Sequence, residues 1–118
     1  MRGNRVSYFN FFNLFSGGCC KSVKAEFTGI GWYKLQLRSF KLQLGRVNEK
    51  AHYISSDGKN GIWYSHGKWL VGPQKNKGTR TAYFELKSYA DCPTEPHDQW
   101  NWRYISTNSR GFKIVCKD

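Results

Sequence analysis

The chain has 118 residues, which fits one small domain and argues against an enzyme that closes two lobes over its substrate. Aromatic residues make up 17% and hydrophobic residues 39%, which is too rich in large side chains for a disordered chain. Lys and Arg number 19 against 8 Asp and Glu, a formal net charge of +11, so attraction to a polyanion is expected. No apolar run approaches the roughly 18 residues of a membrane-spanning helix, and we expect no transmembrane segment.

The first 18 residues are typical of a degraded secretory signal peptide. Two arginines precede an apolar stretch, residues 6–15, and the small residues 16–18 follow it. Asn10 and Asn13 interrupt the apolar stretch and weaken the signal. The alternative is a short aromatic arm that packs on the domain. In both cases residues 19–118 are predicted to form a single β domain.

Four cysteines, Cys19, Cys20, Cys92 and Cys116, favour disulfides in an oxidising compartment outside the cell. They contain no C-x-x-C and have no histidine at zinc-ligand spacing, so no metal site is expected. Adjacent Cα atoms lie about 3.8 Å apart, below the ~4.4 Å usual for a disulfide, so the Cys-Cys pair should not bridge itself. Two pairings remain, Cys19 with Cys116 and Cys20 with Cys92, or the exchanged pair. A competing pattern joins Cys92 to Cys116 and leaves two thiols for a partner chain.

The first half of the domain is predicted to form short strands. Residues 33–38 alternate leucine or tyrosine with lysine, glutamine or arginine, the period of a strand with one wet, cationic face. Residues 41–44 repeat the alternation, with Leu42 and Leu44 inward. Residues 56–58 and 59–61, Ser-Asp-Gly and Lys-Asn-Gly, are predicted turns.

The second half continues the pattern. Strands are expected at residues 62–64 and 69–71, joined by a hairpin turn at residues 65–68, with Trp63 and Trp69 in the core. Residues 74–80 form a predicted basic loop, and residues 90–99 an irregular segment with two prolines. Further strands are predicted at residues 81–86, 100–105 and 112–117. The fold class is therefore all-β, a compact sandwich or small barrel of about six to eight short strands stapled by disulfides.

The order of these pieces resembles a small cysteine-paired module of secreted invertebrate proteins. The resemblance spans residues 19–116 and rests on Cys19-Cys20, Gly31-Trp32-Tyr33-Lys34-Leu35, Gly45-Arg46, Leu70-Val71-Gly72-Pro73, Cys92-Pro93, a tryptophan at 100 or 102, and Val115-Cys116. One departure is that Val47-Asn48 follows Gly45-Arg46, where the pattern has Pro-x-Tyr. The resemblance implies an extracellular, disulfide-linked β module, often found beside other extracellular modules, and it implies no ligand.

No residue pattern points to catalysis. His52 is placed in a strand and His66 in a turn, and His97 lies in the irregular segment. The carboxylates Asp91, Glu95 and Asp98 fall in that same segment, where a solvated loop is favoured over an acid and base pair or a calcium site. There is no G-x-S-x-G elbow and no phosphate-binding glycine loop. We expect a protein that is not an enzyme and uses no cofactor.

Binding is the remaining class of function. An exposed ring beside a cation can stack on a sugar while the cation contacts a sulfate, carboxylate or phosphate. The positive charge is concentrated in residues 19–89, with 13 basic and 4 acidic residues, whereas residues 90–118 hold 4 of each. The candidate ligand-binding residues form two clusters in that central segment: Trp32, Lys34, Arg38 and Lys41, and Lys75, Lys77 and Arg80.

The function predicted from these features is a secreted binding module for acidic glycans or other extracellular polyanions. One alternative is a host-defence or toxin-like protein that meets anionic membrane surfaces, aided by the phenylalanines of residues 8–15. Another is a matrix component linked to its neighbours through Cys19 or Cys20. Nucleic acid is an unlikely partner because it does not fit the expected compartment.

Overall fold

The computed structural model describes residues 18–27, 39–96 and 99–117, which form a closed barrel of eight antiparallel strands. The strands are β1 (Ser22–Phe27), β2 (Ser39–Leu42), β3 (Tyr53–Ser55), β4 (Asn60–Ser65), β5 (Lys68–Pro73), β6 (Phe84–Lys87), β7 (Trp102–Tyr104) and β8 (Ser109–Cys116). Each strand pairs with the next along the chain, and β8 returns to pair with β1. Of the two predicted all-β architectures, the chain adopts the barrel.

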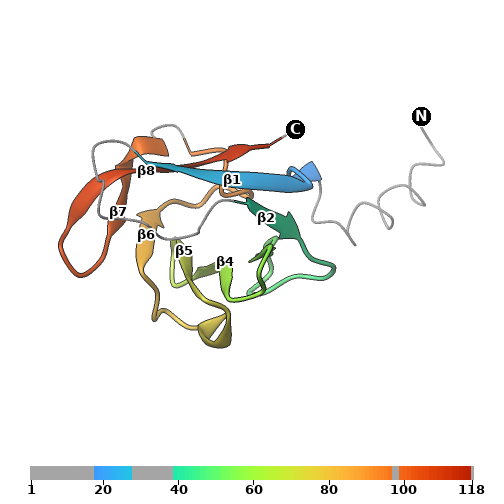
Figure 1. Cartoon of the computed structure of the whole chain (residues 1–118). Coiled ribbons are helices and arrows are strands. Elements are labelled where there is room, and N and C mark those ends of the chain that lie inside the picture. Colours follow the sequence, from blue (N-terminus) through green and yellow to red (C-terminus); the bar gives the residue numbers. More distant parts are fainter. Residues whose placement is uncertain (1–17, 28–38, 97–98, 118) are drawn as a thin grey trace.

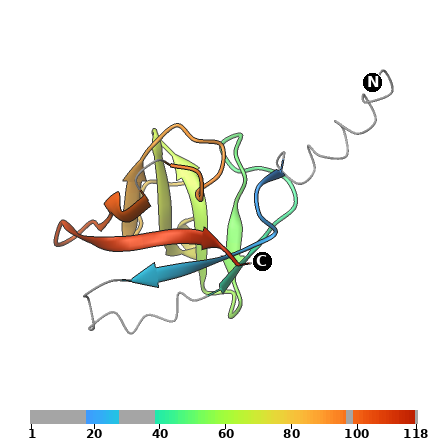
Figure 2. The ribbon, with the colours of Figure 1, turned by 90° about the horizontal axis from the view of Figure 1, so that it is seen from above.

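Strands β1 and β8 close the barrel. Their register runs from Val23 opposite Cys116 to Phe27 opposite Phe112, and β1 also pairs with β2 on its other edge. Figure 2 shows the two strands side by side with their arrows in opposite directions. In Figure 1 they lie on the opposite side of the barrel from β4 and β5.

The barrel interior is filled by large apolar side chains, as expected for eight strands. Alternate residues of the strands point inward, so Val23, Phe40, Tyr53, Ile62 and Ile114 are fully buried. An aromatic cluster fills one part of this core. Its members are Phe84 stacked on Phe112 at 4.3 Å between ring centroids, and Trp102 edge-on to Phe112 at 5.4 Å.

The hairpin β4–β5 is buried on both faces. Trp63 and Leu70 face each other on the outer side, yet they are only 0% and 1% exposed, and the segment between β5 and β6 covers Trp63. Trp63 Nε1 donates a hydrogen bond to the Thr79 carbonyl of that segment. A Cβ on Gly72 would lie only 2.8 Å from Ala82 Cα, so the close approach of this segment requires glycine there.

The predicted hairpin turn is confirmed. Ser65 pairs with Lys68, which leaves a two-residue loop of His66 and Gly67 with φ angles of 54° and 77°. Positive φ at both positions is the geometry that matches the twist of adjacent strands. Trp63 and Trp69 are buried as predicted, and Asp57 stabilises the first turn because Asp57 Oδ1 accepts from the Lys59 amide.

Two local predictions are wrong. Asn60 and Gly61 belong to β4 and do not form a turn, because they pair with Pro73 and Gly72 of β5. Leu44 does not face inward, since β2 ends at Leu42 and Leu44 is 67% exposed. The predicted strand at residues 33–38 lies outside the described residues, as do residues 1–17 of the predicted signal peptide or arm.

Both disulfides join the start of β1 to the last quarter of the chain. Cys19 bonds to Cys92 and Cys20 bonds to Cys116, with Cα–Cα distances of 5.6 and 5.7 Å. This is the second of the two predicted pairings, and it excludes a bond between Cys92 and Cys116. All four sulfurs are used within the chain. The thiols that a matrix link through Cys19 or Cys20 would need are therefore not free.

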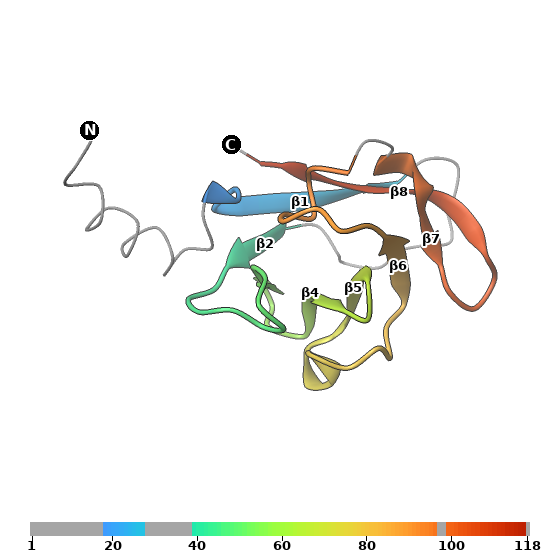
Figure 3. The same ribbon diagram turned by 180° about the vertical axis from the view of Figure 1, so that it is seen from behind.

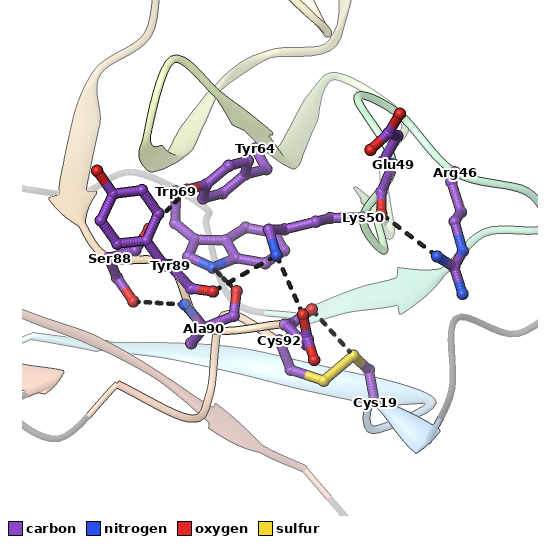
Figure 4. A network of polar contacts seen from close by, with 11 residues as sticks. Cys19, Arg46, Glu49, Lys50, Tyr64, Trp69, Ser88, Tyr89, Ala90 and Cys92 are labelled. Carbon is purple, nitrogen blue, oxygen red and sulfur yellow. Dashed lines mark hydrogen bonds and ion pairs between the residues drawn. A yellow bond between two sulfur atoms is a disulfide. The ribbon is translucent and has the colours of Figure 1, made fainter.

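Lys50 holds the segment around Cys92 against the barrel (Figure 4). Its ammonium lies 3.1 Å from Asp91 Oδ1 and 4.9 Å from the centre of the Tyr64 ring. Trp69 Nε1 donates to the Ala90 carbonyl at 3.1 Å, and Tyr64 Oη donates to the Ser88 carbonyl at 2.9 Å. Residues 88–92 are thus fixed by hydrogen bonds as well as by the disulfide.

The disulfide pairing gives a first testable prediction. Replacing Cys20 and Cys116 together by alanine should lower the free energy of unfolding by about 4 kcal/mol, because the bond closes a loop of nearly the whole domain. The remaining Cys19 and Cys92 should still form a bond, leaving no thiol to react with a thiol reagent. Urea unfolding and thiol titration of the native protein measure both effects.

The matched control replaces Cys19 and Cys116, which leaves Cys20 and Cys92. These two sulfurs are not partners, so this variant should keep two reactive thiols or unfold at a lower urea concentration than the variant without Cys20 and Cys116. An equally stable protein with a Cys20–Cys92 bond would contradict the pairing.

Candidate functional site

The outer surface of β5 to β8 carries a pocket of about 490 Å³ rich in cations. These strands follow one another around the barrel, as Figure 3 shows. The described residues that line the pocket come from four strands and the segment before β7: Lys68 of β5, Glu85, Leu86 and Lys87 of β6, Asn101, Arg103 of β7, and Arg110 of β8. Four cations therefore surround a single carboxylate.

The strand register brings these charges together. Lys68 lies directly opposite Lys87, and Arg103 lies directly opposite Arg110. Like charges at directly opposed positions of an antiparallel pair destabilise a sheet. A β-bulge between β7 and β8 sets this register, because Trp102 pairs with Phe112 whereas Arg103 pairs with Arg110. Without the bulge Arg103 would lie opposite Gly111.

Glu85 lies between the two like-charge pairs and is almost fully buried, at 8% exposed. Lys68 Nζ donates to Glu85 Oε1 at 3.0 Å, and Arg103 Nε donates to Glu85 Oε2 at 2.8 Å. Arg103 Nη2 contacts the same oxygen. Burial by itself raises the pKa of Glu85, but the hydrogen bonds from Lys68 and Arg103 outweigh it and hold that pKa below its ordinary value. Glu85 is therefore a charged carboxylate at neutral pH.

The other two cations have no such partner. Among the described residues, no carboxylate forms an ion pair with Lys87 or Arg110. Arg110 Nη1 instead donates to the neutral Asn101 Oδ1 at 2.9 Å. The pocket thus presents two cations without an ion pair beside a centre in which one carboxylate faces two further cations, and it attracts anions.

Two exposed aromatic rings lie close in the chain to residues that line the pocket, Trp100 beside Asn101 and Tyr89 two residues after Lys87. Trp100 precedes Asn101 in the short 3₁₀ helix η3 (Gln99–Asn101), and it is 36% exposed with Lys113 Nζ 4.5 Å from its ring centre. Tyr89 is 79% exposed, and its ring lies close to Gly67, which precedes Lys68. Rings beside cations are the combination that binds the flat face of a sugar or base.

The sequence-predicted binding residues do not line this pocket. Trp32, Lys34 and Arg38 lie outside the described residues. Lys41 is exposed on β2, and Lys75 and Arg80 are exposed on the segment after β5. None of these three is among the residues that line the pocket.

Lys77 points inward and is not part of a free basic loop. Its ammonium donates to His52 Nδ1 at 2.8 Å and to the Tyr53 carbonyl at 3.0 Å. His52 Nε2 lies 3.2 Å from the Leu44 carbonyl, which can only accept, so this nitrogen carries the proton and Nδ1 is free to accept from Lys77. Lys77 fastens its segment to β3, and burial lowers its pKa to about 8.

Arg103, Arg110, Lys68 and Lys87 were missed because no sequence cluster contains them. Two come from residues 19–89, and two come from residues 90–118, where acidic and basic residues balance. The usable signal was the hairpin formed by β7 and β8, with an arginine on each strand. The register that makes them neighbours depends on the bulge, and sequence alone does not show it.

Two further observations concern other functions. His66 Nδ1 lies 2.6 Å from Ser65 Oγ, and His97 is outside the described residues. Within the described ranges, no three His, Cys, Asp or Glu side chains are grouped so that they could hold a metal ion. In that same part of the chain, no helix has the length and apolar character of a membrane span.

Comparisons with protein-family models, with curated protein sequences and with solved structures find no match to this chain. The resemblance to a cysteine-paired extracellular module therefore stays a prediction.

His52 gives a prediction for the pH dependence of stability. Burial first, and then the charge of Lys77, lower its pKa from 6.5, although the Leu44 carbonyl opposes them. The unfolded chain therefore binds a proton at His52 more readily than the folded chain does. The free energy of unfolding should fall as the pH drops from about 7.5 to about 5.5, through the unfolded pKa. Urea unfolding at a series of pH values measures the loss.

The control is His52→Gln, whose amide can accept from Lys77 and donate to Leu44 without gaining a charge. It should lose less stability over the same pH range than the native chain. Equal losses would show that His52 is not the group responsible.

Proposed function

We propose that the protein binds acidic glycans, or other extracellular polyanions of similar chemistry, through the pocket on β5 to β8. The observation that carries the proposal is the pair of directly opposed like charges, Lys68 with Lys87 and Arg103 with Arg110, around one carboxylate. Such pairs cost stability unless an anion lies between them. A bound sulfate or carboxylate would relieve the repulsion at Lys87 and Arg110.

Other features support a saccharide ligand outside the cell. Trp100 and Tyr89 are exposed rings within two residues of Asn101 and Lys87, which line the pocket. The formal net charge of +11 attracts a polyanion at long range and speeds its association. Two disulfides are consistent with an oxidising compartment, so we propose that the protein is secreted. No catalytic step is part of this proposal.

The proposal predicts which lysines and arginines matter. The double variant Lys87→Gln/Arg110→Gln should bind a heparin-type oligosaccharide about tenfold to a hundredfold more weakly, since two unpaired cations are removed. The slope of log affinity against log salt should also fall, by roughly one to two. Titration calorimetry at several salt concentrations gives both values.

The matched control is Lys41→Gln/Lys75→Gln, which removes the same charge from two exposed positions outside the pocket. Its affinity should change by less than about threefold, because only long-range attraction is lost. An equal loss in both double variants would mean that binding follows net charge and not the pocket. No measurable binding of the native chain would refute the proposal altogether.

A further inference from the structure

The pocket has a carboxylate at its centre, which limits the ligand groups that can lie directly against it. Glu85 is charged and lies between Lys68 and Arg103, and its side chain is 10% exposed at the pocket lining. Its two oxygens can accept about four hydrogen bonds, and Lys68 and Arg103 supply three of them. Carboxylate oxygens only accept, so a ligand group that meets Glu85 must be a donor.

Lys87 and Arg110 flank this centre. Lys87 is on β6 and Arg110 is on β8, with β7 between them. Arg110 lies in the same cross-strand row as Glu85, and Lys87 lies two residues farther along β6 than Glu85. Two strand spacings and two residues of rise separate their backbones by roughly 12 Å. A ligand that contacts both cations therefore places two anionic groups apart, with its uncharged part over Glu85.

Acidic polysaccharides have this arrangement of groups. Their sulfates or carboxylates are separated along the chain by hydroxyl groups, which can donate to a carboxylate. Inorganic polyphosphate carries a charge on every unit, and at neutral pH its ionised oxygens are acceptors. It would place negative charge directly against Glu85, and like charges across an interface are strongly unfavourable.

We propose that the pocket selects acidic glycans that keep free hydroxyls between their charged groups, and that Glu85 is the residue that rejects polyanions without hydroxyls. This inference rests on the proposed function, because it assigns a ligand class to the same pocket. Glu85 acts by repulsion of the wrong ligand as well as by holding Lys68 and Arg103 in ion pairs, where they are less available to another anion.

The variant Glu85→Gln tests the role of the carboxylate. It removes the negative charge and frees Lys68 and Arg103 for phosphate, so the affinity for inorganic polyphosphate should rise about tenfold. The affinity for a partly sulfated oligosaccharide of matched charge should rise by a smaller factor, because its sulfates gain Lys68 and Arg103 while its hydroxyls lose a charged acceptor, so the ratio of the two affinities shifts toward polyphosphate. Calorimetry at about 0.15 M salt compares the two probes.

Glu26→Gln is the matched control for charge. Glu26 lies on β1, within 3.4 Å of Lys24 Nζ and 3.9 Å of Lys113 Nζ, and it is not among the pocket residues. This variant should move the two affinities equally and only slightly. If Glu85→Gln also shifts both probes by the same factor, Glu85 contributes net charge alone and the inference is overturned.

A second measurement on the native chain does not depend on the folding of a variant. The same oligosaccharide with its hydroxyls converted to sulfates carries more charge but has no donor for Glu85. The inference expects no gain in affinity, whereas tighter binding in proportion to the added charge would overturn it.

The two proposals fail in different ways. If neither probe binds, or if Lys87→Gln/Arg110→Gln leaves binding unchanged, the pocket is not the binding site and the proposed function fails. If binding needs Lys87 and Arg110 but polyphosphate and the glycan bind the native chain equally, the proposed function stands and the selection by Glu85 fails.

Discussion

The closure of the sheet through β1 and β8 is the constraint on which the rest of the structure depends. An open sheet of short strands would expose two edges with unpaired backbone groups. Pairing of β8 with β1 closes the sheet into a barrel and removes both edges. The two disulfides start at Cys19 and Cys20, immediately before β1, and they fix this strand to the segment after β6 and to the end of β8. Arg110 is placed on the pocket because β8 is held between β7 and β1.

The closed barrel also places charges of one sign at directly opposed positions of neighbouring strands. The interior of the barrel is apolar and tightly filled, so the outward positions must carry the polar residues. On β5 to β8 these outward positions include Lys68, Lys87, Arg103 and Arg110, and Glu85 forms ion pairs with two of the four while its charge offsets one of them. The repulsion that remains is localised at Lys87 and Arg110. A surface of this kind gains most from an anion that reaches both.

The segment between β5 and β6 shows how packing overrides composition. Its lysines and glycine are typical of a mobile basic loop, yet it covers Trp63 through the Thr79 carbonyl and is fastened by Lys77 to His52 and Tyr53. The buried indole of Trp63 and the half-buried ammonium of Lys77 both need hydrogen-bond partners. The Thr79 carbonyl of this segment accepts from Trp63, and Lys77 of this segment donates to His52 and Tyr53. Lys77 therefore supports the fold and is not presented to a ligand.

The sequence by itself determined the all-β class, the His66-Gly67 turn, the core positions of Trp63 and Trp69, and the two candidate disulfide pairings. These follow from local rules: the period of two along a strand, the positive φ of a turn, and the reach of a disulfide. Only the tertiary structure decided between the pairings, chose a barrel, and brought Lys68 and Lys87 to Arg103 and Arg110. Those outcomes depend on strand register and on one β-bulge, which arise from contacts between residues far apart in the chain.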